Sequence, residues 1–165
     1  MQNKSHIQKG FAIACVFIIF NVFRHISKTY FDEWTSFVSW GIVVVGVLAS
    51  ILFYNKQINQ NSSFSSLFGY GFKTAAVATC LVIVYTTLAV YFVFPNFTNE
   101  LLQQTMEQAK KAGANSVIAQ DQAEMAKKVV KISFISMTLM GTLFLGVIGS
   151  LLGAVAAKKN PQPLN

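Results

Sequence analysis

Few residues in this sequence could carry chemistry, and most of them lie at the ends of long apolar segments. Arg24 and His25 form the one basic pair that suggests a ligand, because a guanidinium matches a phosphate group through two parallel hydrogen bonds. One interpretation is therefore contact with the phosphate headgroup of a lipid. The other is an interfacial anchor, whose charged end extends out of the apolar segment to reach water.

The usual signs of catalysis do not occur in the sequence. None of the six acidic residues lies inside an apolar segment, and there is no metalloprotease, phosphate-binding-loop or serine-hydrolase motif. Cys15 and Cys80 stand alone inside apolar segments, without the spacing of a metal site or a disulfide framework. We therefore expect no enzyme, no catalytic residue, no cofactor and no metal. A lipid-modifying enzyme lacks candidate residues.

Polar residues inside the apolar segments suggest a different role. Asn21, Tyr85 and a row of serines and threonines could line a polar path, which a small oligomeric transporter or channel would need. A proton-coupled transporter usually keeps a carboxylate or a histidine at mid-membrane, and this sequence has neither there. Serine and threonine can instead bond to their own helix backbone, and Asn21 is suited to a hydrogen bond between helices.

The composition places these residues in a membrane. Of 165 residues, 53% are hydrophobic and 12% are charged, whereas about 25% charged residues is usual in a soluble domain. This small number of polar side chains cannot cover an apolar core in water. Lipid must therefore supply part of the surroundings. The net charge of +7 favours attraction to anionic lipid headgroups over nucleic-acid binding, because no basic cluster is interleaved with aromatic residues.

Four apolar segments are long enough to cross a bilayer as helices, which takes about 20 residues. They cover about residues 7–26, 36–55, 73–94 and 131–157, and Pro95 stops the third. Their length and their lack of alternation exclude a barrel. We therefore expect an all-α fold that forms a single integral membrane domain over residues 1–165.

An even number of spans puts both termini on one side of the membrane. Six basic residues and no acidic one fall on that side, against seven basic and six acidic residues on the other. Cytoplasmic loops are enriched in lysine and arginine, and the unneutralised lysines favour cytoplasmic termini in the inner (cytoplasmic) membrane. The six basic residues are Lys4, Lys9, Lys56, Lys73, Lys158 and Lys159.

A stripe of phenylalanines precedes the third span. Phe64, Phe68 and Phe72 are four residues apart and share one face of a helix. A short amphipathic helix of this kind would lie at the headgroup level and turn into the span at Lys73. It could fix the depth and angle of the span, or it could be a docking surface for lipid or a partner.

The polar segment of about residues 96–130 is rich in helix-forming residues. Thr98 is expected to cap a first helix and Gly113 to end it. A second helix is expected to start near Ser116 and to run toward the fourth span. This extramembrane helical segment is either a solvated connector or an arm that binds a partner.

Small residues in the fourth span predict close helix packing. Gly149 and Gly153 form a GxxxG pair, and Gly146 and Ser150 make a parallel row one position over. The rows could pack against other spans of the same chain or against a second copy in a homo-oligomer. The sequence does not assign the partner.

The chain resembles a bacterial family of small membrane proteins, the family of unknown function numbered 4199. The resemblance rests on FSSLFGYGFKT at residues 64–74, on the apolar span that follows and on PNF at residues 95–97, and it covers most of the chain. It implies four transmembrane helices, a polar segment between spans three and four, and no catalytic residues. It also suggests membrane glycosyltransferases as partners.

These observations together favour a non-enzymatic accessory or scaffold subunit of a membrane complex, associated with envelope lipid or glycan machinery. Its partners would be membrane lipids and either a larger membrane protein or further copies of itself, and not nucleic acid. The alternative is the small oligomeric transporter or channel.

Overall fold

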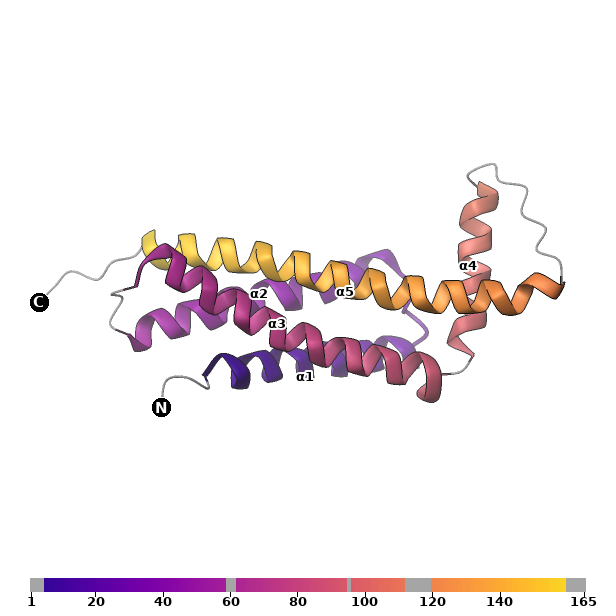
Figure 1. Cartoon of the computed structure of the whole chain (residues 1–165), viewed down its shortest axis with the longest axis horizontal. Coiled ribbons are helices and arrows are strands. Elements are labelled where there is room, and N and C mark those ends of the chain that lie inside the picture. The colour runs from indigo at the N-terminus through magenta and orange to yellow at the C-terminus, as the bar shows by residue number, and fades with distance from the viewer. Residues whose placement is uncertain (1–4, 59–61, 95, 112–119, 160–165) are drawn as a thin grey trace, which may run out of the picture. The chain divides into compact units, whose positions relative to one another are not determined.

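The computed structural model describes residues 5–58, 62–94, 96–111 and 120–159, and over these ranges all regular structure is helical. A π-helical turn, Ala89–Val93, extends the third helix. The expected all-α fold is confirmed. The α-helices are α1 (Ser5–Ile26), α2 (Glu33–Gln57), α3 (Phe64–Leu88), α4 (Phe97–Lys111) and α5 (Gln120–Lys159) (Figure 1).

Four of the helical segments are long and apolar enough to cross a membrane, and each overlaps one predicted span. The chain is therefore a multi-pass membrane protein. Helix α4, with its glutamates, lysines and glutamines, does not belong to this set. The four segments are Ser5–Ile26, Glu33–Gln57, Phe64–Val93 and Met125–Lys158.

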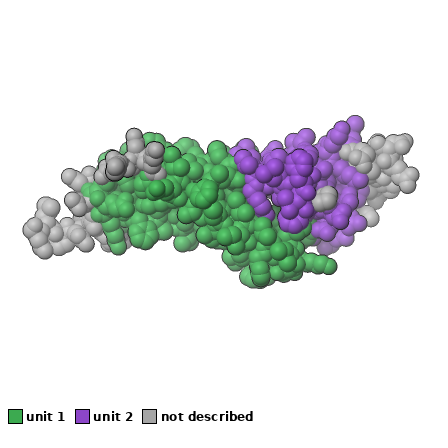
Figure 2. Space-filling view, turned by 90° about the horizontal axis from the view of Figure 1, so that it is seen from below, with its two compact units in different colours: residues 1–82, 140–165 green, residues 83–139 purple. Residues whose placement is uncertain are grey.

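The chain divides into two compact units, which Figure 2 shows in different colours. Unit 1 comprises residues 1–82 and 140–165, and unit 2 comprises residues 83–139. Both boundaries fall inside helices, one in α3 and one in α5.

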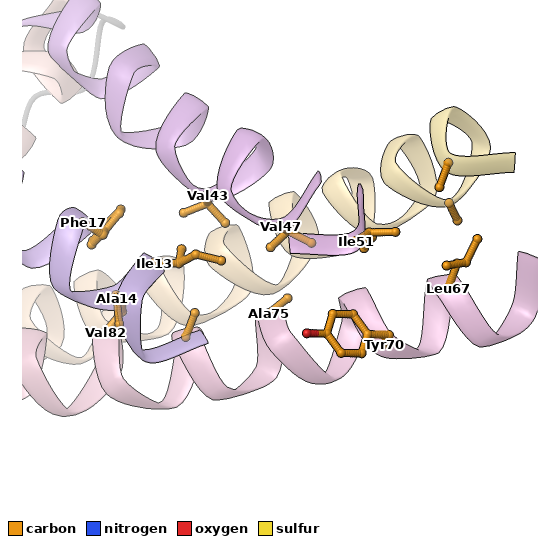
Figure 3. Close-up of a cluster of buried hydrophobic side chains, with 13 residues drawn as sticks. Ile13, Ala14, Phe17, Val43, Val47, Ile51, Leu67, Tyr70, Ala75 and Val82 are labelled. Carbon is orange, nitrogen blue, oxygen red and sulfur yellow. The ribbon is translucent and has the colours of Figure 1, made fainter. Parts of the chain in front are cut away.

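In unit 1, helices α1 and α2, the first part of α3 and the last part of α5 run side by side (Figure 1). Helix α2 contributes Val43, Val47 and Ile51, which are four residues apart and share one buried face (Figure 3). They pack with Ile13 of α1 and Ala75 of α3 in one apolar cluster. This periodicity explains why the helix buries one side and leaves the other to its surroundings.

The described helices expose large apolar side chains and bury polar ones. In unit 1, for example, Trp34 is 65% exposed and Phe11 57%, whereas Thr74 and Ser150 are fully buried. Lipid tails suit the exposed apolar side chains, and buried hydroxyls bond to backbone inside the protein. The hydroxyl of Ser150 donates to the Gly146 carbonyl at 2.7 Å, and that of Thr74 donates to the Tyr70 carbonyl at 3.0 Å.

The phenylalanine stripe belongs to α3 itself. Helix α3 begins at Phe64 and continues past Lys73 without the expected turn, because Leu67, Thr74 and Val82 continue one buried face. The rings of Phe64, Phe68 and Phe72 stack along the helix with centroids 6.4 and 6.3 Å apart. Phe64 and Phe68 are partly buried, and Phe72 is 43% exposed.

In unit 2, α4 begins two residues earlier than predicted, and the capping role of Thr98 was wrong. The Asn96 carbonyl accepts the first helical amides, those of Asn99 at 3.0 Å and Glu100 at 3.2 Å. Thr98 therefore lies inside the helix, and its buried hydroxyl has no partner among the described residues. The packing of Phe97 explains the shift, because its ring meets that of Phe134 edge-on at 5.3 Å.

The sequence also predicts that the first helix of the polar segment ends at Gly113 and that a second helix starts near Ser116. Gly113 and Ser116 lie outside the described residues, as does Pro95. Helix α5 is unbroken from Gln120 to Lys159, so its polar beginning is continuous with the fourth span.

Candidate functional site

The Arg24 guanidinium lies inside the protein, not at its surface as a snorkelling anchor would, and the residue is only 4% exposed. Its Nη1 donates to Asn21 Oδ1 at 3.3 Å and to Ser39 Oγ at 3.0 Å. Its Nη2 donates to Ser36 Oγ at 3.1 Å and to the Tyr30 carbonyl. The Tyr30 ring also lies against it, with its centroid 4.6 Å from Cζ.

Local structure builds this site by folding the connection between α1 and α2 back over the arginine. Lys28 adopts a left-handed conformation with φ of 56°, and the amide of Thr29 donates to the Arg24 carbonyl at 3.0 Å. Thr35, in the first turn of α2, donates through its hydroxyl to the carbonyls of Thr29 and Asp32. These bonds bring the Tyr30 carbonyl next to the guanidinium.

Chemically, the site is a cross-link between segments. Each hydrogen-bond partner of Arg24 is neutral, and the partners come from α1, from the connection and from α2. The Nε atom has no partner within the described residues. A guanidinium held by four bonds fixes the angle between two helices, because its planar fork allows few alternative geometries.

His25 lies against Tyr30 of the same connection. It is half-buried, and its ring meets that of Tyr30 edge-on at a centroid distance of 6.4 Å. The predicted contact of Arg24 and His25 with a lipid headgroup stays a prediction. To bind Arg24, a phosphate would have to accept a hydrogen bond from Nε or displace one of the present acceptors of Nη1 and Nη2.

The packing residues of the fourth span lie against α2 and α3 of the same unit. A Cβ atom built on Gly149 would lie 2.9 Å from the Val44 carbonyl oxygen, which belongs to the α2 backbone. One on Gly153 would lie 2.6 Å from Ile51 Cδ1. These two glycines therefore let the backbones of α5 and α2 approach closely.

The parallel row of Gly146 and Ser150 faces α3. A Cβ atom on Gly146 would lie 2.5 Å from that of Ala75, and Ser150 Oγ lies 2.9 Å from where a Cβ on Gly71 would be. Gly10 plays the same part in α1, since its Cβ would lie 2.7 Å from the Thr74 carbonyl oxygen. Small residues thus define three helix contacts within the chain.

A second polar cluster, which sequence reasoning did not identify, joins the beginnings of α1 and α3 to the end of α2. The hydroxyl groups of Ser5 and Tyr70 share a hydrogen bond of 3.0 Å, and the Tyr70 ring stacks on that of Tyr54 at 3.9 Å. Lys9 Nζ donates to the Ser50 carbonyl at 3.2 Å and lies 5.4 Å from the Tyr70 ring centroid. The interfacial position of the two tyrosines was the available signal.

At the same end, α2 and α5 are joined directly. Asn55 Nδ2 donates to the Ala157 carbonyl at 3.1 Å. This bond links residues that are 102 positions apart in the sequence, so the beginnings of α1 and α3 and the ends of α2 and α5 lie together in unit 1.

The remaining candidate residues are Asn21, the two cysteines and possible metal ligands. Asn21, besides receiving the Arg24 bond, donates from Nδ2 to the Phe17 carbonyl at 2.8 Å within its own helix. Cys15 and Cys80 are free thiols. Over the described ranges, no three histidine, cysteine, aspartate or glutamate side chains gather in a way that could hold a metal ion.

Comparisons with known proteins add one finding. The comparison with curated proteins and the comparison with solved structures each gave no match. A family model described as a protein of unknown function, DUF4199, matches residues 9–159. The match includes the second, third and fourth spans, the first span from Lys9 onward, the polar segment and the Arg24 site. The chain therefore belongs to the DUF4199 family.

Proposed function

We propose that this protein is a non-enzymatic accessory subunit of a membrane complex. In this proposal unit 1 is the membrane anchor, and α4 is the arm that contacts a larger membrane protein. The partner would belong to the envelope lipid or glycan machinery of a bacterial inner membrane. Both termini would lie in the cytoplasm, and α4 on the opposite side.

The observation that carries this proposal is the charged face of α4. Glu100, Gln103, Glu107 and Lys111 are all exposed, and their spacing puts them on one stripe of the helix. The helix is held at its beginning by Phe97, which is buried against Phe134. A helix that is anchored at its first residue and carries an exposed charged stripe is suited to docking on a polar surface.

The packing of unit 1 supports an anchoring role. Glycine contacts bring α5 against α2 and α3, and Arg24 cross-links α1 to α2. Packed contacts between backbones resist deformation, because separating the helices loses many contacts at once. The alternative is a small oligomeric transporter or channel; a rigid anchor differs from a transporter, which must change shape to move a solute.

Site-specific cross-linking tests the proposal. A photoreactive phenylalanine analogue at Gln103, in the full-length chain and in native membranes, should give a covalent product with one membrane protein. The same analogue at Gln57, exposed at the end of α2, is the control and should not give that product. The cross-linked protein should also co-purify with the unmodified chain in mild detergent at a fixed ratio.

Two matched double variants identify the contact. Glu100→Gln with Glu107→Gln should abolish co-purification, because both acids lie on the exposed stripe. Asn99→Lys with Thr105→Lys changes the net charge by the same amount at exposed positions other than the two acids, with Thr105 on the opposite face of the helix, and should leave it intact. Equal effects of the two variants, or solute flux by the purified chain in proteoliposomes without a partner, would refute the accessory role.

A further inference from the structure

The end of unit 1 where α1 and α3 begin and α2 and α5 end carries a concentration of positive charge. Lys56, Lys73 and Lys158 are exposed there, and Lys9 lies half-buried among them. The sequence contains no acidic residue before Asp32, between residues 34 and 99, or after residue 124. Among the described residues of unit 1, the acidic side chains are Asp32 and Glu33 at the opposite end of α2, so no described carboxylate neutralises these lysines.

Tertiary contacts join the segments of the four helices that carry these lysines. Lys9 is tied to α2 by its bond to the Ser50 carbonyl, and Lys56 is adjacent to Asn55, which bonds to Ala157 of α5. Lys158 follows Ala157 directly. Lys73 lies one helical turn beyond Tyr70, whose hydroxyl meets α1.

Aromatic rings accompany the lysines. The stacked rings of Tyr54 and Tyr70 lie at this end, and the Lys9 ammonium lies 5.4 Å from the Tyr70 ring centroid and 5.9 Å from that of Phe53. Phe72, next to Lys73, is 43% exposed. Tyrosine and lysine together mark the depth at which a helix meets lipid headgroups, because the rings fit the boundary and the ammonium groups reach the phosphates.

We propose that this basic end binds the phosphate headgroups of anionic phospholipids, with Lys56, Lys73 and Lys158 as the contacting residues. The charge complementarity is direct, because an anionic lipid supplies negative charge that the described residues of this end do not provide. Each lysine near an anionic surface contributes about a fivefold gain in binding, so three give about a hundredfold. The proposal does not depend on the accessory role of α4, which lies in unit 2.

Native mass spectrometry of the full-length protein in detergent tests this, with phosphatidylglycerol and phosphatidylcholine as the probes. The wild type should bind phosphatidylglycerol about a hundredfold more tightly than phosphatidylcholine. The triple variant K56Q/K73Q/K158Q should lose about a hundredfold in phosphatidylglycerol affinity, since each substitution removes about fivefold. All three positions are exposed, and an unchanged circular dichroism spectrum will show that the variant folds.

A matched control distinguishes the effect of where the lysines lie from the effect of the total net charge. The triple variant K28Q/K111Q/K128Q removes three exposed lysines from other parts of the chain and should keep the wild-type affinity within about twofold. Glycerol 3-phosphate at millimolar concentration should not compete with the lipid. Equal losses in the two triple variants, no loss in the first, or full competition by glycerol 3-phosphate would each overturn the proposal.

Discussion

Replacing Gly149 by alanine offers the sharpest test of how the helices of unit 1 pack. The added Cβ would lie 2.9 Å from the Val44 carbonyl oxygen, 3.2 Å from Val44 Cα and 3.1 Å from Val47 Cβ, whereas ordinary contacts begin at 3.4 Å. Two of these atoms are backbone, so no rotamer change of a side chain can relieve the clash. Helix α5 must instead move away from α2 by about half an ångström.

The expected loss of unfolding free energy follows from comparison with a second glycine of the same helix. Gly141→Ala adds the same methyl group, but nothing lies within 4 Å of the new Cβ. Both substitutions gain the same helix propensity, about 1 kcal/mol in water, so this gain cancels in the comparison. Overpacking costs about 1–3 kcal/mol, and Gly149→Ala should be less stable than Gly141→Ala by that amount.

The measurement is the free energy of unfolding in mixed micelles, followed by circular dichroism as a denaturing detergent is added. Both variants are measured beside the wild type under identical lipid and detergent conditions. Equal stability of Gly149→Ala and Gly141→Ala would show that α5 and α2 are not in backbone contact. The close approach described above would then be wrong.

Three further predictions follow from single contacts. Arg24→Lys keeps the charge but loses the fork, and should lower the unfolding free energy by about 1.5–3 kcal/mol; a loss no larger than that of His25→Ala would contradict the cross-link. Tyr70→Phe removes the hydroxyl bond to Ser5 and keeps the ring stack, so the same titration should show a loss of about 1 kcal/mol. Phe97→Ala should speed amide hydrogen exchange in α4, measured by mass spectrometry, because the helix loses its buried edge contact; unchanged exchange would count against that anchor.

The number and type of the helices could be predicted because a bilayer imposes a simple rule. A segment that crosses it must bond its own backbone groups and needs about 20 apolar residues, and both properties can be read from a sequence. The start of α4 was harder, since Thr98 is a good capping residue by type. The edge contact of Phe97 with Phe134, a residue of another helix, prevailed over that local preference.

The candidate sites were less predictable, because each depends on what a residue meets in space. Arg24 has the sequence signature of an interfacial anchor, and only the connection folded back over it places its guanidinium among neutral partners. The glycines of α5 illustrate the same point. Gly141 and Gly149 are the same residue in the same helix, yet one faces open space and the other the α2 backbone.

By itself, the sequence determined that this chain is helical and crosses a membrane, because hydrophobic length and backbone self-satisfaction are properties of each segment alone. Only the tertiary structure decided which faces touch, that Arg24 is buried, and that the helix ends carrying Lys9, Lys56, Lys73 and Lys158 pack together in unit 1. Those outcomes depend on distances between residues as far as 102 positions apart, which no local pattern encodes.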